Sequence, residues 1–180
     1  MSKSKTLAEM KSWILSLSIA VGIVLIVRTF LFAPYIVEGA SMEPTLHNQE
    51  KIFVNKLTTV TGFARGEIVI IKGSEDNYVK RIIGLPGDKI EMKNDQLFVN
   101  GEVVKESYLA YNREVAEQMG VYLTEDFETV TVPKNQYFVM GDNRLVSMDS
   151  RNGLGLIKEN QIVGSPEFVY FPFKEFRTVE

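Results

Sequence analysis

Residues 13–32 read WILSLSIAVGIVLIVRTFLF, and Arg28 is the only charged side chain in this run. In a helix that rises about 1.5 Å per residue, a run of this length spans about 30 Å, the thickness of the hydrocarbon core of a bilayer. Arg28 lies near one end, where a long basic side chain can extend to the lipid headgroups. Pro34 follows and cannot continue a helix. The run therefore predicts one transmembrane helix over residues 13–32.

Two other structures are compatible with parts of this pattern. A buried core helix of this length would be unusual, and the run has no polar face. A cleaved signal peptide would explain the basic start and the apolar middle, with Val37–Gly39 as a possible cleavage site. The apolar run is long for a signal peptide, however, so the pattern favours an uncleaved signal anchor.

The charges around the run predict its orientation. Residues 1–32 have a net charge of +3 and the rest of the chain has −6, in keeping with the total of −3. Three lysines precede the helix, whereas Lys51 is the only lysine or arginine in residues 33–52. The positive-inside rule then leaves the short N-terminus in the cytoplasm. We therefore expect a cytoplasmic tail at 1–12, a transmembrane anchor at 13–32 and an extracytoplasmic catalytic domain at 33–180.

The composition of the 180 residues excludes several classes of protein. Fractions of 45% apolar and 24% charged residues are ordinary for a packed globular protein and exclude a disordered or collagen-like chain. The absence of cysteine excludes a disulfide scaffold, a thiolate zinc site and a cysteine nucleophile. His47 is the only histidine and lies in a polar turn, which predicts a surface residue. The net charge of −3 argues against nucleic acid as a partner, and we expect no metal or cofactor.

Beyond the apolar run, the pattern changes from helical to short and extended. Short apolar runs alternate with close turn signals, which predicts a mainly β domain with an antiparallel sheet or barrel. The expected strands are residues 51–56, 67–72, 77–83, 89–93, 96–100, 129–132, 137–140 and 167–171. The turn signals among them are Pro86-Gly87, Asn94-Asp95 and Asn100-Gly101.

Two segments receive no catalytic role. Residues 102–128 are acidic, with helix formers at 114–119, and we interpret them as an excursion from the sheet. Residues 171–176 read FPFKEF, which favours packing within the domain. Contact with a membrane surface is the alternative, because aromatic side chains suit the interface.

Three segments contain candidates for chemistry. The first, residues 39–46, reads GASMEPTL and places Ser41 shortly after the anchor. A serine among small residues suits an exposed nucleophile whose neighbouring backbone N–H groups face a substrate carbonyl. Taken alone, the serine is a weak signal, and a turn residue or helix cap is the more common explanation.

The second segment, residues 78–88, reads YVKRIIGLPGD. Strand alternation places Lys80 on one face with Tyr78 and Ile82. Burial between them would disfavour the ammonium form and lower the pKa of Lys80. The structural alternative is a lysine that extends from the edge of a strand.

The third segment, residues 141–153, reads GDNRLVSMDSRNG and alternates acidic and basic residues. By itself it indicates a loop held by ion pairs, in which Ser147 and Ser150 add possible hydrogen bonds to a lysine. In a chain with no cysteine and no usable histidine, the three segments together point to a Ser-Lys dyad. In such a dyad a neutral amine takes the hydroxyl proton.

At these segments the sequence resembles the type I signal peptidases, the membrane-anchored serine proteases that remove signal peptides from exported proteins. The matching motifs are SMEPTL at 41–46, KRIIGLPGD at 80–88 and GDNRLVSMDSR at 141–151, in the family's order. The single anchor and the compact length resemble the Gram-positive form. The resemblance implies a largely β catalytic domain, a fold shared with self-cleaving SOS repressors.

The resemblance also implies roles for individual residues. Ser41 is the implied nucleophile, Lys80 the general base and Ser147 the serine that orients the lysine amine. The residues implied to support the site, with Asp149 and Arg151 as an ion pair, are Arg81, Asp142, Arg144, Asp149 and Arg151. Those implied to form shallow pockets for small substrate residues at −3 and −1 are Val37, Met42, Leu46, Tyr78 and Val79. Where some members have an oxyanion-stabilising serine, this chain has Gly39, so the second oxyanion donor stays open.

The expected function is that of a signal peptidase I, acting on signal-peptide-bearing secretory precursors at the outer face of the cytoplasmic membrane. Its expected partners are these precursors and membrane lipid. A self-protease of the SOS-repressor type would need a DNA-binding domain and a cytosolic location. This chain has the apolar helix at 13–32 where that domain would be, and a membrane anchor does not fit a cytosolic location. A membrane-anchored binding or assembly protein that has lost activity is the other alternative, and the joint presence of Ser41, Lys80 and Ser147 argues against it.

Overall fold

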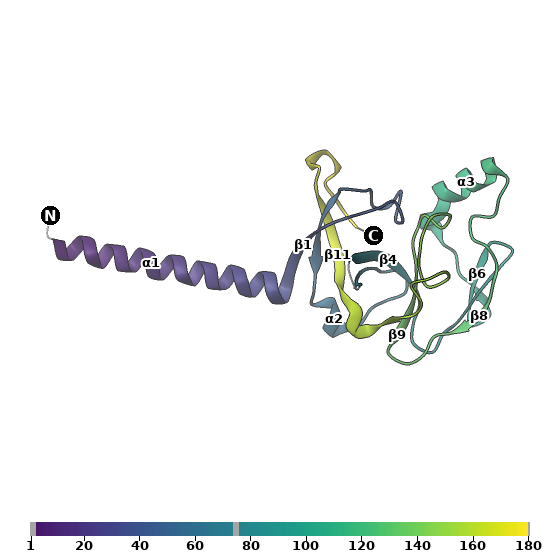
Figure 1. Ribbon diagram of the computed structural model, residues 1–180, viewed down its shortest axis with the longest axis horizontal. Helices are drawn as coiled ribbons and strands as arrows, with labels where there is room; N and C mark the ends of the chain where they lie inside the picture. Colours follow the sequence, from purple (N-terminus) through teal and green to yellow (C-terminus); the bar gives the residue numbers. More distant parts are fainter. Residues whose placement is uncertain (1–2, 74–75, 180) are drawn as a thin grey trace.

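The computed structural model describes residues 3–73 and 76–179 (Figure 1). A long N-terminal helix projects alone from a domain of curved antiparallel sheets, and strand β1 connects the two parts. The prediction of a mainly β protein with one N-terminal apolar helix is confirmed.

The N-terminal helix ends before its predicted boundary. Helix α1 (Lys3–Ile26) continues into a π-helical turn, η1 (Val27–Leu31), and the chain then enters strand β1 (Phe32–Ile36). The helical run ends before Pro34, as predicted, and Pro34 lies exposed within β1 at the edge of the sheet, where a missing N–H is tolerated. Lys56 also holds the helix end, because its Nζ donates to the carbonyl oxygens of Arg28 and Thr29, both at 3.2 Å.

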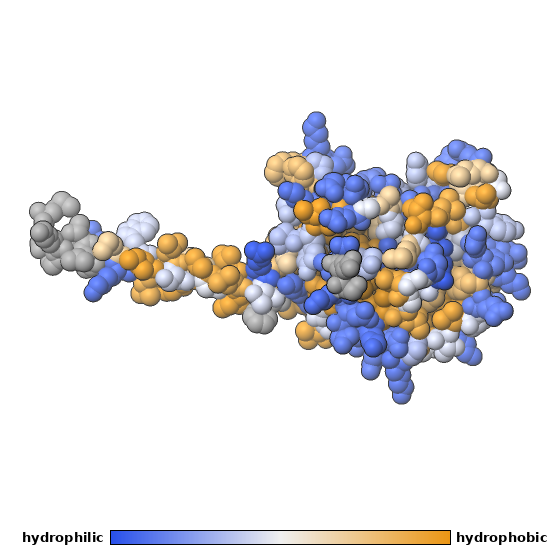
Figure 2. Space-filling view, in the orientation of Figure 1, coloured by the Kyte–Doolittle hydropathy of each residue, from blue (hydrophilic) through white to orange (hydrophobic). Residues whose placement is uncertain are grey.

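The helix is apolar and makes no core with the rest of the protein. Residues Glu9–Thr29 have the length and composition to cross a membrane, with a mean hydropathy of 2.1, and none of this window is buried. Figure 2 shows apolar side chains over most of its length. A helix of this kind hides its apolar surface from water only if something outside the domain, such as lipid, covers it.

Within the described residues, eight strands form one antiparallel sheet in the order β1-β2-β11-β3-β4-β9-β10, with β12 paired to β11. The strands after β1 are β2 (Lys51–Asn55), β3 (Ile68–Lys72), β4 (Asn77–Gly84), β9 (Gln136–Met140), β10 (Ile157–Lys158), β11 (Ile162–Phe171) and β12 (Arg177–Thr178). Strand β4 lies between β3 and β9, with Lys80 opposite Val69. Because β4 is an interior strand, hydrogen bonds to β3 and β9 fix its backbone on both sides.

A second sheet pairs four further strands of the described chain in the order β7-β6-β5-β8. These are β5 (Lys89–Lys93), β6 (Gln96–Val99), β7 (Glu102–Val103) and β8 (Phe127–Thr131). Asn94 and Asp95 have φ angles of 51° and 58°, and Asn100 and Gly101 have 55° and 85°. Positive φ at both residues is typical of the two-residue turns that match strand twist, so both predicted hairpin turns are confirmed.

The remaining elements are short, apart from the helix of the 102–128 segment. They are α2 (Thr58–Thr61), α3 (Ala110–Met119) and the 3-10 turns η2 (Ser107–Leu109), η3 (Glu159–Gln161) and η4 (Phe173–Glu175). The helix expected near 114–119 is α3, which ends at Gly120 in the left-handed conformation.

Sequence patterns missed edge strands and strands of only two residues. Strands β1, β7, β10 and β12 were not predicted, and β11 begins at Ile162 rather than near residue 167. Gly164 lies against the carbonyl of Asn55, where a side chain would collide, and a bulge between Pro166 and Phe168 lets the strand continue. The packing expected for residues 171–176 is wrong for Phe173 and Phe176, which stay 82% and 66% exposed. Phe173 packs its ring against Phe171 and Phe176 against Phe168, and much of each ring remains outside the core.

Candidate active site

Ser41 lies in the turn that follows β1. Two hydrogen bonds close the loop behind it, Val37 N–H to Glu50 O and Gln49 N–H to Val37 O, both at 2.8 Å. Met42 and Leu46 are one helical turn apart, with Leu46 N–H donating to Met42 O at 3.1 Å, and both are buried. Because these two side chains anchor the turn in the core, the adjacent Ser41 is held in place while remaining partly exposed.

Lys80 is the group that meets the Ser41 side chain. Its Nζ lies 2.6 Å from Ser41 Oγ, although 39 residues separate the two in sequence. Tyr78 and Ile82 pack together in one core cluster and Val79 in another, as the predicted alternation along the strand requires. Lys80 itself is 2% exposed.

Burial decides the protonation of this amine. Loss of hydration lowers the pKa of Lys80 to about 8, against the opposing effect of the carboxylates of Asp149 and Asp142 and with a small contribution from Arg151. An amine with this pKa is partly neutral near physiological pH, so it can accept a proton from the hydroxyl beside it.

A buried ion pair lies next to the lysine in sequence. Arg81 donates to both carboxylate oxygens of Asp142, at 2.9 and 2.7 Å, and its third nitrogen donates to Gly66 O at 2.6 Å. Thr45 Oγ1 donates to the same carboxylate at 2.5 Å. Asp142 therefore links β4 to the turn that contains Ser41.

The 141–153 loop approaches the serine turn from the other side. Asn143 N–H donates to Ser41 O at 3.0 Å and Asn143 Nδ2 to Ala40 O at 3.1 Å. Gly141 faces the Ser41 carbonyl and the Ser147 side chain so closely that no side chain would fit. Asn143 was not among the predicted site residues, although it lies inside the third motif.

Asp149 and Arg151 form the expected ion pair within this loop. Arg151 Nε lies 2.9 Å from Asp149 Oδ1 and Arg151 Nη2 lies 2.9 Å from Oδ2. Burial alone would raise the pKa of Asp149, but the hydrogen bonds and charge of Arg151 and the N–H of Gly141 hold it below its usual value. The pair therefore stays ionised and fixes the loop.

Ser147 does not make the hydrogen bond implied for it. Within the part of the chain that the structure describes, the buried Ser147 hydroxyl makes no hydrogen bond to Lys80, whose Nζ donates to Ser41; it lies close enough to Asp149 to help lower the pKa of that carboxyl. Gly39 has a φ angle of 86° and its N–H donates to Asn48 Oδ1 at 2.9 Å, so its amide is already engaged. The role of Ser147 and the second oxyanion donor remain predictions.

The five residues expected to contact substrate separate into two groups. Val37, Met42 and Leu46 are at most 2% exposed and belong to the core cluster beneath the serine turn. Tyr78 and Val79 are partly exposed and pack on opposite faces of β4. Any role of the buried group in binding would act through the shape of the surface above it.

The acidic excursion contributes residues that sequence reasoning missed. Arg144 is fully buried and its Nη2 lies 2.5 Å from Glu106 Oε1, with Thr124 Oγ1 3.3 Å from Nη1. Tyr108 donates to Glu106 and places its ring 4.1 Å from the guanidinium of Arg81. A buried arginine requires a carboxylate, but the sequence does not indicate which of the many acidic residues supplies it.

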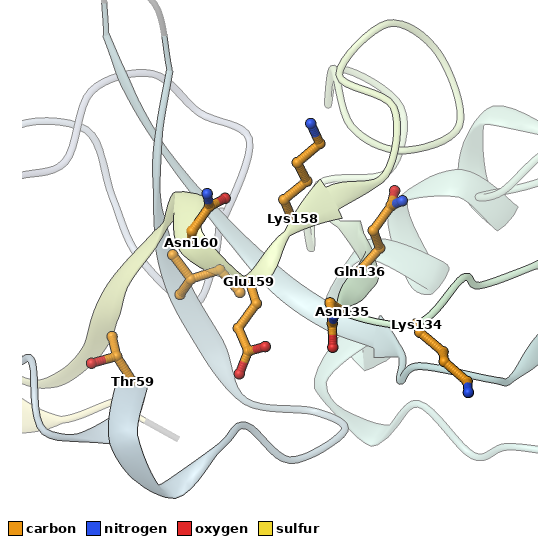
Figure 3. A pocket seen from close by; sticks show the side chains of 8 residues that line it. Thr59, Lys134, Asn135, Gln136, Lys158, Glu159 and Asn160 are labelled. Atoms are coloured by element: carbon orange, nitrogen blue, oxygen red, sulfur yellow. The ribbon is translucent and has the colours of Figure 1, made fainter.

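His47 and a separate surface hollow lie outside this network. His47 has 54% of its side chain exposed and is 3.9 Å from Glu43, which confirms the predicted surface position. An open hollow of about 690 Å³ is lined by polar side chains that include Lys134, Lys158 and Glu159 (Figure 3). Its lysines point in different directions, and its lining contains neither Ser41 nor Lys80.

A serine hydroxyl beside a buried amine, at the surface of a β domain that carries an apolar helix, defines the class of a serine peptidase. The chain belongs to the signal peptidase family, peptidase S26, whose family model matches residues 10–171. The resemblance inferred from the three motifs is confirmed.

Its relatives extend over nearly the whole chain. The signal peptidase I S of Bacillus subtilis is 56% identical over 178 residues, which cover 98% of this chain and 95% of that protein. A signal peptidase I of Bacillus amyloliquefaciens is 57% identical and covers 97% of this chain and 91% of that protein. The crystal structure of a signal peptidase I from Enterococcus faecalis is 34% identical with a TM-score of 0.53, covering 58% of this chain and 96% of that chain.

Proposed function

We propose that this protein is a signal peptidase I that cleaves signal peptides from secretory precursors with a Ser-Lys dyad. The observation that carries the proposal is the 2.6 Å contact between Lys80 Nζ and Ser41 Oγ. The relatives named above support the substrate class, because they are signal peptidases by name and match almost the full chain.

The proposed reaction has two steps. Neutral Lys80 takes the proton of Ser41, whose oxygen attacks the carbonyl carbon of the −1 residue, and the protonated amine then gives that proton to the leaving nitrogen. In the second step Lys80 takes a proton from water, the hydroxide attacks the acyl-enzyme, and Ser41 recovers its proton. In this proposal the buried Ser147 hydroxyl, next to Asp149, holds the amine once Ser41 has turned to the carbonyl.

The proposed substrate contact is an extended segment lying beside the dyad. Partly exposed Tyr78 and Val79 would flank it, while buried Val37, Met42 and Leu46 would shape the surface beneath. Because these buried side chains fill the space beneath the surface, any pocket there is shallow. A shallow pocket accepts only small side chains, as expected at the −3 and −1 positions of the substrate.

The proposed location is the outer face of the cytoplasmic membrane. The exposed apolar helix supports a single-pass anchor, and the excess of basic residues before it supports a cytoplasmic tail at 1–12 with the catalytic domain outside. Exposed Phe173 and Phe176 are suited to the lipid headgroup region.

The test is cleavage of a purified precursor by the full-length protein in detergent. Ser41→Ala and Lys80→Ala should each reduce kcat/KM by at least about 10³-fold, and the double variant should be little worse, because the two groups act as a unit. Ser107→Ala, at an exposed serine, is the matched control and should behave like the wild type. Substantial cleavage by Ser41→Ala would rule out the serine mechanism, and an inactive wild type would favour a binding or assembly protein.

A further inference from the structure

Residues 102–128 match none of the three motifs, yet helix α3 of this segment reaches both loops of the site. Asn112 is the third residue of α3 and is 8% exposed. Its Nδ2 lies 2.9 Å from Glu43 O and 2.9 Å from Asp142 O. The two hydrogens of one amide therefore hold two backbone carbonyls that are far apart in sequence.

The two carbonyls belong to the two loops that must stay aligned for catalysis. Glu43 lies two residues after Ser41, and Asp142 opens the loop that contains Ser147 and Asp149. Lys80 is fixed by an interior strand, whereas Ser41 stands on a turn. The position of the hydroxyl relative to the amine therefore depends on what holds this turn against its neighbours.

Helix α3 is itself anchored to the back of the site. Glu106, just before it, is buried against Arg144, and Tyr108 stacks on Arg81. Leu109 and Ala116 add a small apolar cluster beneath the helix. Asn112 thus projects from a fixed support, which a clamp between two loops requires.

We propose that Asn112 is a positioning residue that clamps the serine turn to the 141–151 loop and so holds Ser41 against Lys80. This inference rests on the proposed function. A shift of about 1 Å at a reacting group can lower a rate about 10²-fold, so the loss of two hydrogen bonds at this point is enough to matter.

The clamp also keeps water away from the lysine. The charged groups that act on Lys80 are Asp142, Asp149 and Arg151, and all three belong to the loop that Asn112 holds. If this loop moved away from the serine turn, the amine would regain water and its pKa would rise from about 8 towards 10.5. Partial unfolding alone would reduce the amount of active enzyme without changing that pKa.

The test compares Asn112→Ala and Asn112→Asp with Ala116→Gly in the full-length protein. Alanine suits a helix better than asparagine, and aspartate has the same size and favours the first helical turn, so neither should weaken α3 itself. Ala116→Gly weakens the same helix without removing the amide, which makes it the matched control. The measurements are kcat and KM on a precursor peptide, the pH dependence of kcat/KM, thermal stability, and titration of the Lys80 amine by NMR.

Both Asn112 variants should lose about 10- to 100-fold in kcat at temperatures where they remain folded. In both variants the acidic limb of the kcat/KM profile and the NMR titration midpoint of Lys80 should move to higher pH. In Ala116→Gly both should stay at their wild-type positions. Wild-type kcat and titration in Asn112→Asp would overturn the inference while leaving the proposed function intact. The same shift in Ala116→Gly would also overturn it, since the cause would then be the helix as a whole. A wild-type enzyme without cleavage that depends on Ser41 would instead refute the proposed function.

Discussion

Burial gives Lys80 the low pKa that its proposed role as general base requires. At pH 7 a pKa of about 8 leaves about one tenth of the amine neutral, whereas an ordinary lysine would have about 0.03% in that form. The same burial destabilises the folded ammonium form, so the site exchanges some stability for reactivity. The proposed chemistry needs no histidine, and the His47 side chain is exposed, with its Nδ1 3.9 Å from Glu43 Oε1.

The depressed pKa predicts how activity depends on pH. Because only neutral Lys80 can act as base, kcat/KM should rise about tenfold per pH unit at low pH and level off above about pH 8. The measurement is kcat/KM against pH on one precursor peptide for the wild type and His47→Ala. The two profiles should share their acidic limb. If the acidic limb of the kcat/KM profile disappeared in His47→Ala, the base would be His47. If kcat/KM continued to rise past pH 10, the lysine would have an unperturbed pKa.

At the scale of elements, the excursion between β7 and β8 is part of the site. Its Glu106 pairs with Arg144, and the two side chains are 1% and 0% exposed. Removing one member of a buried pair leaves the other charge uncompensated, which is far more destabilising than losing a surface pair.

Glu106→Ala should therefore lower the free energy of unfolding by about 3–5 kcal/mol and reduce activity with it. Glu102→Ala, at an exposed glutamate on β7 of the same segment, is the control and should change stability by less than about 0.5 kcal/mol. Denaturant unfolding and precursor cleavage measure the two effects. Wild-type stability in Glu106→Ala would show that the Arg144 network is not an integral part of the fold.

Local patterns predicted the elements that depend on local chemistry. The two-residue turns at Asn94-Asp95 and Asn100-Gly101 specify their own hairpins, and strand alternation places Tyr78 and Ile82 on one side of β4. Pro34 lies beyond the helix end but inside strand β1, because a proline excludes a helix interior but not an edge strand. The strands β10 and β12 have two residues each, too few to show the alternation of apolar and polar side chains that predicts a strand.

The whole molecule is a β domain on an apolar stalk, and the proposed topology is testable because the chain has no cysteine. Single cysteines introduced as Ser4→Cys and Lys174→Cys should differ in their reactivity with a membrane-impermeant maleimide on intact protoplasts. Lys174→Cys should be labelled, because residue 174 is exposed in the domain proposed to lie outside. Ser4→Cys should react only after detergent is added. The reverse pattern would invert the orientation.

The identity of the reacting groups, the anchor and the class of fold follow from the amino-acid sequence, because each rests on residues close together in the chain. An apolar run, a turn dipeptide and a short motif carry their physical meaning locally. Which groups surround Lys80, and how dry it is, follow only from tertiary structure. Ser41, Asp142 and Asn112 meet through loops and a helix separated by tens of residues, and a buried amine or carbonyl can take any partner that folding brings within about 3 Å. Long-range packing therefore decides both the pKa of Lys80, the proposed base, and the contacts of Asn112, the proposed clamp.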